Sequence, residues 1–131
     1  MAPYIDPAER PPRIRKAVFD ITLTRGVAAI NHATVAAEVG ASLATIRRWI
    51  PAWQLPPSGL EWIQRRQHAR QFEPFHNGLP GTSLERRGAN ALLRELPVDD
   101  ERRDEERVWW LLTSAFAEEK WVREEVAKEP R

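Results

Sequence analysis

The chain of 131 residues contains no cysteine and only one methionine and one tyrosine. Without cysteine it has neither disulfides nor a thiol nucleophile, a usage common in reducing compartments, so we expect a cytoplasmic protein. No apolar run approaches the roughly 18 residues that a membrane span needs, and we expect no membrane contact. The first residues, MAPYIDPAERPPR, carry acids and prolines where a secretory signal would carry an apolar segment, so we expect no signal peptide.

The chain also lacks a large excess of either charge, since its formal net charge is +1 at pH 7. Residues 1–53 hold seven Lys or Arg against four Asp or Glu, residues 54–98 hold six against four, and residues 99–131 hold seven against eleven. This mild asymmetry, with a basic front and an acidic back, suits a protein whose N-terminal part approaches phosphate. The proportions of hydrophobic (42%) and charged (30%) residues are typical of a globular domain.

Motifs of enzyme chemistry are missing as well. The sequence has no Gly-rich phosphate loop, no HExxH and no defensible Ser/His/Asp arrangement, and its histidines at 32, 68 and 76 lack metal-ligand spacing. The carboxylates of residues 99–106 alternate with arginines that pair with them at i+3 or i+4, so this run predicts a helix start and not an acid/base pair. We therefore expect no enzyme, no metal site and no cofactor.

Four prolines make residues 1–12 a flexible arm, and apolar spacing predicts a helix directly after it. Ile14, Ala17, Val18 and Ile21 follow the i, i+3, i+4, i+7 pattern of one helix face, which predicts a helix over residues 13–25. Gly26 then fits a left-handed C-cap.

Residues 31–53, NHATVAAEVGASLATIRRWIPAW, carry the most informative pattern. Asn31 is a good N-cap for a helix that ends at Val39, and Gly40 follows where a sharp turn needs a positive φ. Ser42 is a second N-cap for a helix over residues 43–50, which Pro51 ends. Two short helices joined by a tight glycine turn are typical of a helix-turn-helix DNA reader.

The second of these helices has an exposed polar face, because Ile46 and Ile50 point inward at i and i+4. Arginine on such a face can pair with guanine in the major groove or with phosphate. The alternative without a DNA-binding role is a plain helical hairpin that carries two surface arginines, Arg47 and Arg48. The candidate DNA-binding residues are Asn31, Ser42, Leu43, Thr45, Arg47, Arg48, Trp49 and Trp53, with Gly40 as the structural turn.

The remainder predicts further helices and no strand. A stiff linker over residues 51–57 precedes a capping box, Ser58 to Glu61, that starts a helix to about residue 72. A loop over 74–81 leads to a helix over 82–96. Asp99 or Asp100 caps a last helical region, which is either one helix or two helices with a break near 118–120. The expected architecture is all-α with five to seven helices. The apolar stripe of the last region is Val108, Leu111, Leu112, Ala115, Val122 and Val126.

Six tryptophans are many for this length. Trp109 and Trp110 lie about 100° apart on a helix, so we expect one to pack in the core and the other to face an interface or a pocket wall. The more specific alternative is that these aromatic side chains line a ligand-binding site. The arginines at 65, 66 and 70 are interpreted as a solvated helix face in preference to a DNA contact. The candidate ligand or interface residues are Trp62, Trp109, Trp110, Phe116 and Trp121.

Residues 13–53 resemble the DNA-binding domain of the tetracycline-repressor (TetR) family, through RIRKAVFDITLTRG and VAAEVGASLATIRRWIP. The segment LLRELPVDDERRDEERVWWLLTSAF is more loosely similar to part of that family's ligand-binding domain. The resemblance implies a dimeric repressor that binds double-stranded DNA at a pseudo-palindromic operator and is released by a small-molecule inducer. It places a helix-turn-helix domain at 13–53 and a shortened, ligand-binding-like helical domain at 54–131.

The chain departs from the family pattern in sequence and in length. Thr22, Arg47 and Trp53 stand where the family usually has Phe, an aromatic residue and Lys. Family members are typically longer and dimerise through two final helices, and this sequence stops where that interface would begin. The expected alternatives are a truncated member, a fragment, or a short form that dimerises differently. We therefore expect a homodimer that forms differently, or a heterodimer with a longer relative. The alternative function is a helical interaction module that has lost DNA binding and acts through its Trp-rich C-terminal surface.

Overall fold

A computed structural model describes residues 5–76 and 99–128, with the side chains of 72–76 excluded, and every regular element in these ranges is helical. The expected all-α class is therefore confirmed for the described residues, whereas the helix expected over 82–96 lies outside them. The elements are η1 Pro7–Glu9, α1 Arg10–Arg25, η2 Val27–Ala29, α2 His32–Val39, α3 Leu43–Trp49, η3 Ala52–Gln54, α4 Leu55–His76, α6 Asp100–Ala115 and α7 Lys120–Ala127.

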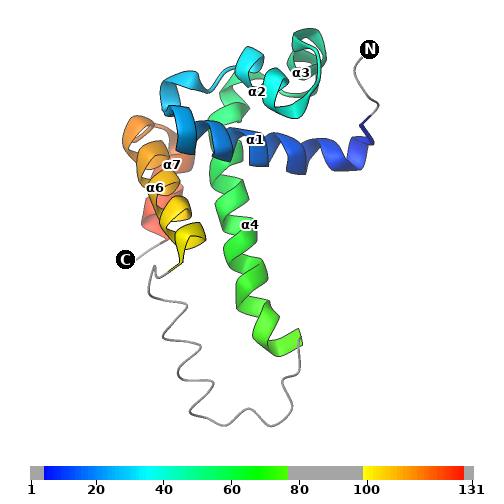
Figure 1. Ribbon diagram of the computed structural model, residues 1–131. Coiled ribbons are helices and arrows are strands. Elements are labelled where there is room, and N and C mark those ends of the chain that lie inside the picture. Colours follow the sequence, from blue (N-terminus) through cyan, green and yellow to red (C-terminus); the bar gives the residue numbers. More distant parts are fainter. Residues whose placement is uncertain (1–4, 77–98, 129–131) are drawn as a thin grey trace.

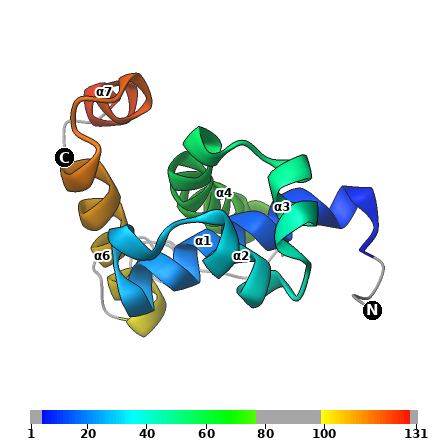
Figure 2. The ribbon, with the colours of Figure 1, turned by 90° about the horizontal axis from the view of Figure 1, so that it is seen from above.

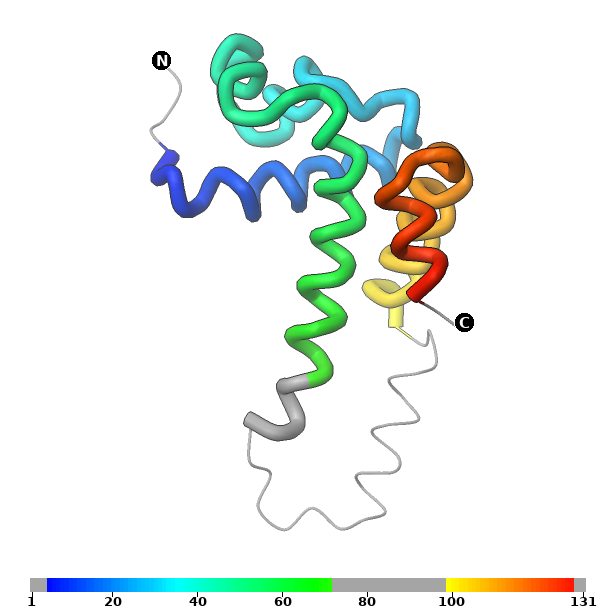
Figure 3. The backbone as a smooth tube through the Cα atoms, turned by 180° about the vertical axis from the view of Figure 1, so that it is seen from behind, coloured from blue at the N-terminus to red at the C-terminus, as the bar shows by residue number. Residues whose placement is uncertain are grey.

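Helices α1, α2 and α3 form a head around the first turns of α4, and the rest of α4 forms a long stem below it (Figure 1). Helix α1 crosses the upper part of α4, and α2 and α3 lie above it. From above, α3 lies over the N-terminal half of α1, with α6 and α7 toward the other end (Figure 2). The view from behind shows α6 and α7 side by side along the upper part of α4 (Figure 3). No helix in the described ranges has both the length and the apolar character needed to cross a bilayer.

Helix α1 begins three residues earlier than expected, at Arg10, so that Pro11 and Pro12 lie in its first turn. Proline is tolerated there because the first N–H groups of a helix have no intrahelical partner. At the other end the N–H of Gly26 donates to the carbonyl of Thr22, 3.0 Å away. Gly26 has a φ of 89° but a ψ of 171°, so the expected left-handed cap is wrong, although a positive φ is required.

Helix α4 corrects the expected linker and capping box. It begins at Leu55, so residues 55–57 are helical, and Pro56 and Pro57 occupy its first turn. Ser58 caps nothing, because its hydroxyl lies inside the helix and donates to the carbonyl of Gln54 at 2.8 Å. The helix extends to His76, past the expected start of a loop at residue 74.

The buried side chains form two clusters, and α1 contributes to both. One lies among α1, α2, α3 and the start of α4, and the other joins α1 and α4 to α6. The expected inward face of α1 is confirmed, as is the burial of Val35 and Ala36, while Val39 is half-buried. The first cluster is Ile14, Ala17, Val18, Ile21, Val35, Ala36, Ile46, Ile50 and Leu55, and the second is Phe19, Leu60, Ile63, Val108, Trp109 and Leu112.

The last helical region is two helices, as the expected break near residue 118 suggests. Asp99 caps α6 by accepting from the N–H of Arg102 at 2.7 Å, and residues 116–119 form turns before α7. The turn redirects the apolar stripe. As a result Ala115 and Val126, which were expected to be buried with Val122, are exposed.

The arginines of α4 also differ from the expected solvated face. Arg65 is exposed, but Arg70 donates two hydrogen bonds to the carboxylate of Glu105 on α6, at 2.9 and 2.6 Å. Arg66 of α4 pairs with Glu101 of α6, and the Nε atom of Arg66 lies 3.7 Å from the carboxylate of Glu105. Glu105 is only 2% exposed, so this cluster is an ion-pair contact between helices α4 and α6.

Gly59 allows three helices to meet. A Cβ at this position would lie 3.1 Å from Val18 Cγ1 on α1 and 3.1 Å from Leu112 Cδ1 on α6. Such distances are shorter than ordinary packing contacts, so a side chain at residue 59 would require Val18 and Leu112 to move by a few tenths of an ångström. Glycine therefore sets how closely α1 and α6 approach α4.

We expect Gly59→Val to lower the free energy of unfolding by about 2 kcal/mol, because overpacking a filled core typically costs that much. Urea denaturation followed by circular dichroism measures the change. Ala69→Val is the matched control, since it places the same side chain on an exposed position of α4 and costs only a helix-propensity difference of under about 1 kcal/mol. Equal losses in the two variants would contradict the close approach at Gly59.

Candidate nucleic-acid interface

The turn between α2 and α3 is built as its residues predict. Asn31 Oδ1 accepts from the N–H of Thr34 at 2.9 Å and caps α2. Gly40 has φ 81° and ψ 30°, a left-handed conformation, and its N–H donates to the carbonyl of Ala36. Ser42 Oγ accepts from the N–H of Thr45 at 3.1 Å and caps α3. Both caps and the glycine turn are therefore confirmed.

Helix α3 is held against the head from two sides. Ile46 and Ile50 are buried in the first cluster, as expected from their spacing. On α2, His32 Nε2 lies 2.8 Å from the carbonyl oxygen of Ile50, and because a carbonyl can only accept, Nε2 carries the proton. This bond ties the first turn of α2 to the end of α3. Sequence reasoning considered His32 only as a metal ligand, and no local pattern could have indicated the contact.

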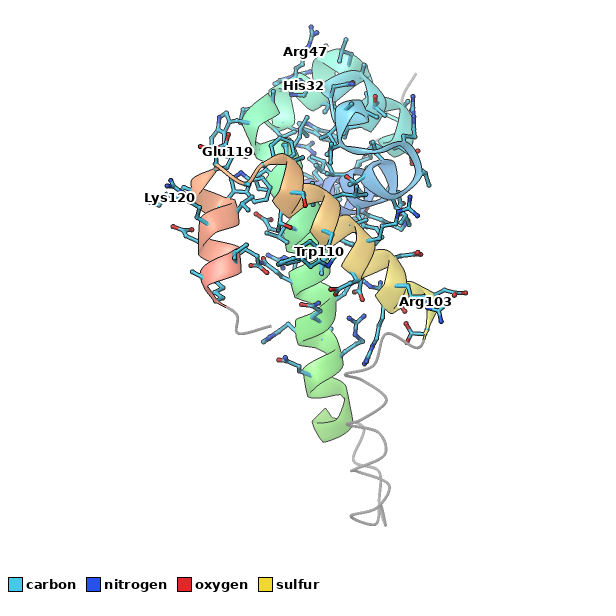
Figure 4. All side chains as sticks on the ribbon, turned by 90° about the vertical axis from the view of Figure 1, so that its left-hand side faces the viewer. His32, Arg47, Arg103, Trp110, Glu119 and Lys120 are labelled. Carbon is cyan, nitrogen blue, oxygen red and sulfur yellow. The ribbon has the colours of Figure 1, made fainter. Side chains whose placement is uncertain are left out.

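The outer face of α3 is exposed and cationic. Arg47 and Arg48 are both exposed, and within the described residues neither takes part in an ion pair or a hydrogen bond. Figure 4 shows Arg47 at the end of the molecule, pointing away from the C-terminal helices. Ala44 is exposed and shares their face at i, i+3 and i+4 spacing, so it belongs with the candidate contacts although the candidate set omits it.

The other candidate residues divide into those that face outward and those already engaged. Leu43 is 37% exposed and Trp53, on η3, is 71% exposed. Ser42 and Thr45 bond to each other through their hydroxyl oxygens at 2.7 Å, so their side chains are partly committed to the cap. Trp49 packs against the first cluster and lies under the guanidinium of Arg10, 4.6 Å from its ring centre. It therefore faces α1 and not the outer face.

Cations of the head differ in how far acidic neighbours neutralise them. Lys16 pairs with Asp20 at 2.7 Å, and Arg13 pairs with Glu9 at 3.5 Å. These pairs are local, solvent-exposed contacts along α1. The arginine pair of α3 has no such acidic neighbour in the described part of the chain, so both guanidinium groups remain available to an external anion.

The aromatic residues expected to form a ligand site or an interface pack mostly inside. Trp109 is buried in the second cluster and donates from Nε1 to Glu125 at 3.3 Å. The exception is Trp110, which is 58% exposed on the outer side of α6 (Figure 4). This confirms the expectation that one indole of the adjacent pair Trp109 and Trp110 is buried and the other is exposed. Partly buried against the same cluster are Trp62, Phe116 and Trp121.

Comparison with known proteins gives no further guidance. No protein-family model, no characterised protein and no solved structure matches the chain. Among the described residues, no group of three or more His, Asp or Glu side chains is placed to hold a metal ion. The interface must therefore be interpreted from its own geometry.

We expect His32→Phe to lower the free energy of unfolding by about 1 kcal/mol, because it removes one partly buried hydrogen bond and leaves the carbonyl of Ile50 without its donor. Thermal unfolding followed at 222 nm measures this loss. His32→Gln retains an N–H donor of similar reach and should recover part of it. If the Phe variant is as stable as the original chain, the bond does not hold α3.

Proposed function

We propose that this protein is a DNA-binding transcriptional regulator that reads a site in double-stranded DNA with helix α3. The observation that carries the proposal is the exposed face of Arg47 and Arg48, which have no ion-pair partner among the described residues, on a short helix capped at Ser42 and braced by α2. A major-groove reader needs a short helix with polar side chains on its outer face and a preceding helix that fixes its orientation.

In this proposal both arginines contact the DNA. Guanidinium groups pair bidentately with guanine O6 and N7, or bind phosphate without regard to sequence. Ala44, between them on the outer face, is small enough to let the backbone of α3 approach the groove, and its methyl can contact a thymine methyl. Asn31 is engaged in its cap, so its contribution is to orient the N-terminus of α2.

The resemblance to the TetR family extends the proposal to a cytoplasmic repressor. Such a repressor acts by binding its operator and blocking access to that DNA. Two copies, or one copy and a longer relative, would place two α3 helices in successive major grooves about 34 Å apart. This spacing would match a pseudo-palindromic operator. A small molecule that alters the position of α3 would release the DNA.

A second candidate is an interaction module. It is favoured by the exposed indole of Trp110 on α6, which is the kind of residue that anchors protein interfaces. In that case the partner would bind the outer side of α6, and α3 would have no ligand.

Binding of the whole chain to DNA from around its own gene separates the two. Fluorescence anisotropy is measured at two salt concentrations with excess random competitor. We expect binding that survives the competitor and falls steeply with salt, since each neutralised phosphate adds close to one unit to the log–log salt slope. A helical chain that fails to bind any of this DNA would favour the interaction module.

A further inference from the structure

A groove of about 700 Å³ runs beside the head, where the N-terminal half of α1, the end of α3 and the first turns of α4 face one another. This volume falls within the range of small-molecule sites, roughly 300–1,000 Å³. The groove adjoins the outer face of α3 and shares Arg48 with it, whereas Arg47 does not line the groove. Of the aromatic candidates that pack against the second cluster, Trp121 also lines the groove.

Indole rings line much of this groove. Trp49 and Trp53 come from the end of α3 and from η3, and Trp121 of α7 also lies along it. Trp53 is 71% exposed, which is unusual for so large an apolar side chain. Arg10 already covers one face of Trp49 with its guanidinium at 4.6 Å. An aromatic molecule would find planar surfaces to stack on, and its binding would remove the Trp53 ring from water.

The same groove has an excess of positive charge. Arg10, Arg15 and Arg48 line it, and the acidic side chain among its lining residues is Glu61. The Nε atoms of Arg10 and Arg15 are buried, and neither has a hydrogen-bond partner in the described part of the chain. Buried donors without acceptors are uncommon in folded proteins and call for an explanation.

The surroundings of Arg15, one of these lining residues, oppose its positive charge. Burial, and then repulsion from the neighbouring Arg65, lowers the pKa of its guanidinium, while Glu61 opposes the shift. A lowered pKa means that the surroundings disfavour the cation. An anion bound in the groove would favour the charged form of these guanidinium groups by pairing with them.

We propose that this groove binds a small planar aromatic carboxylate, with its ring against the exposed indole of Trp53 and its carboxylate paired with Arg10 and Arg15. A neutral aromatic molecule would cover these arginines without compensating their charge, which is unfavourable. Inorganic phosphate, or a phosphate of DNA, would satisfy the arginines but leave the indoles exposed. An aromatic carboxylate satisfies both sets of groups.

Occupancy of the groove would act on α3, in a step that rests on the proposed function. Arg48 lines the groove and also belongs to the outer face of α3. A bound carboxylate would attract its guanidinium toward the groove and away from DNA, so ligand and DNA would weaken each other's binding by the same factor.

Isothermal titration calorimetry of the whole chain with 2-naphthoate tests the site without DNA. Naphthalene-2-methanol is the neutral analogue, and inorganic phosphate is the anion without a ring. Arg10→Gln and Arg15→Gln each remove one proposed carboxylate partner. Arg13→Gln is the matched control, because it removes one positive charge from the same helix outside the groove. Circular dichroism shows whether each variant keeps its helices.

We expect 2-naphthoate to bind more tightly than both comparison compounds. Each groove variant should weaken this binding by about tenfold or more, as loss of a charge-assisted pair does, and Arg13→Gln should change it by less than about twofold. Equal affinity for naphthalene-2-methanol, equal affinity for phosphate, no binding, or an equal effect of all three substitutions would overturn the proposal. A separate anisotropy titration with 2-naphthoate tests the effect on DNA, so that failure of DNA binding leaves the groove result intact.

Discussion

Replacing Arg47 and Arg48 together with alanine is expected to abolish specific DNA binding and to leave the fold unchanged. Both side chains are exposed and make no ion pair or hydrogen bond in the described ranges, so their removal costs the folded state little. Each arginine paired with a base is worth about 1–3 kcal/mol, so the double variant should lose at least about 30-fold in affinity. Anisotropy on the selected site, at one fixed salt concentration, measures this.

The matched control is Arg107→Ala with Arg123→Ala, which removes the same charge from exposed positions on α6 and α7. General electrostatic attraction to DNA would weaken equally in both double variants, because it depends on the total charge within reach. We expect the control to retain most of its specific affinity. Equal losses in the two proteins would sink the assignment of α3 as the reading helix. If only the Arg47 and Arg48 variant loses specific affinity, single substitutions show which arginine carries sequence information.

Arg70→Met is expected to lower the free energy of unfolding by about 3 kcal/mol, which is the low end for breaking a buried ion pair. The substitution removes two hydrogen bonds from Glu105, a carboxylate that is 2% exposed. Arg66 remains 3.7 Å away but is already paired with Glu101, so it compensates only in part. Chemical denaturation at neutral pH measures the change.

The second substitution Glu105→Leu, added to Arg70→Met, should recover at least half of the lost stability. The cost of the single variant comes from an uncompensated buried charge, and two apolar side chains of similar volume remove that charge altogether. If the double variant is as unstable as Arg70→Met alone, the loss comes from poorer packing of the arginine stem between α4 and α6, and the ion-pair account is wrong.

Local signals explain why the two short helices α2 and α3 and the turn between them could be predicted closely. Asn31, Gly40 and Ser42 act within three or four residues of themselves, through a cap, a positive φ and a second cap. The inward faces of α1 and α3 follow from the 3.6-residue period alone. Such features depend on neighbours in the chain, so the sequence displays them directly.

Contacts between distant residues could not be predicted in the same way. Arg70 and Glu105 are 35 positions apart, and each looks like an ordinary charge on a helix surface. His32 reaches a backbone carbonyl 18 positions away, which leaves no trace in residue type. Pro56 and Pro57 fit a linker as well as a first helical turn, because proline is favoured in both. Only the packing of α1 on α4 decides between these alternatives.

Because α1 contributes side chains to both buried clusters, few parts of this chain could be transferred to another protein as a folded unit. One side of α1 places Ile14, Val18 and Ile21 with α2 and α3, while Phe19 packs with α4 and α6. A chimaera that borrowed only residues 27–53 would leave Ile46 and Ile50 without the surface that buries them. The smallest unit that could be transplanted with helix α3 intact therefore runs from Arg10 into the first turns of α4, and its new host must supply an apolar surface for Phe19.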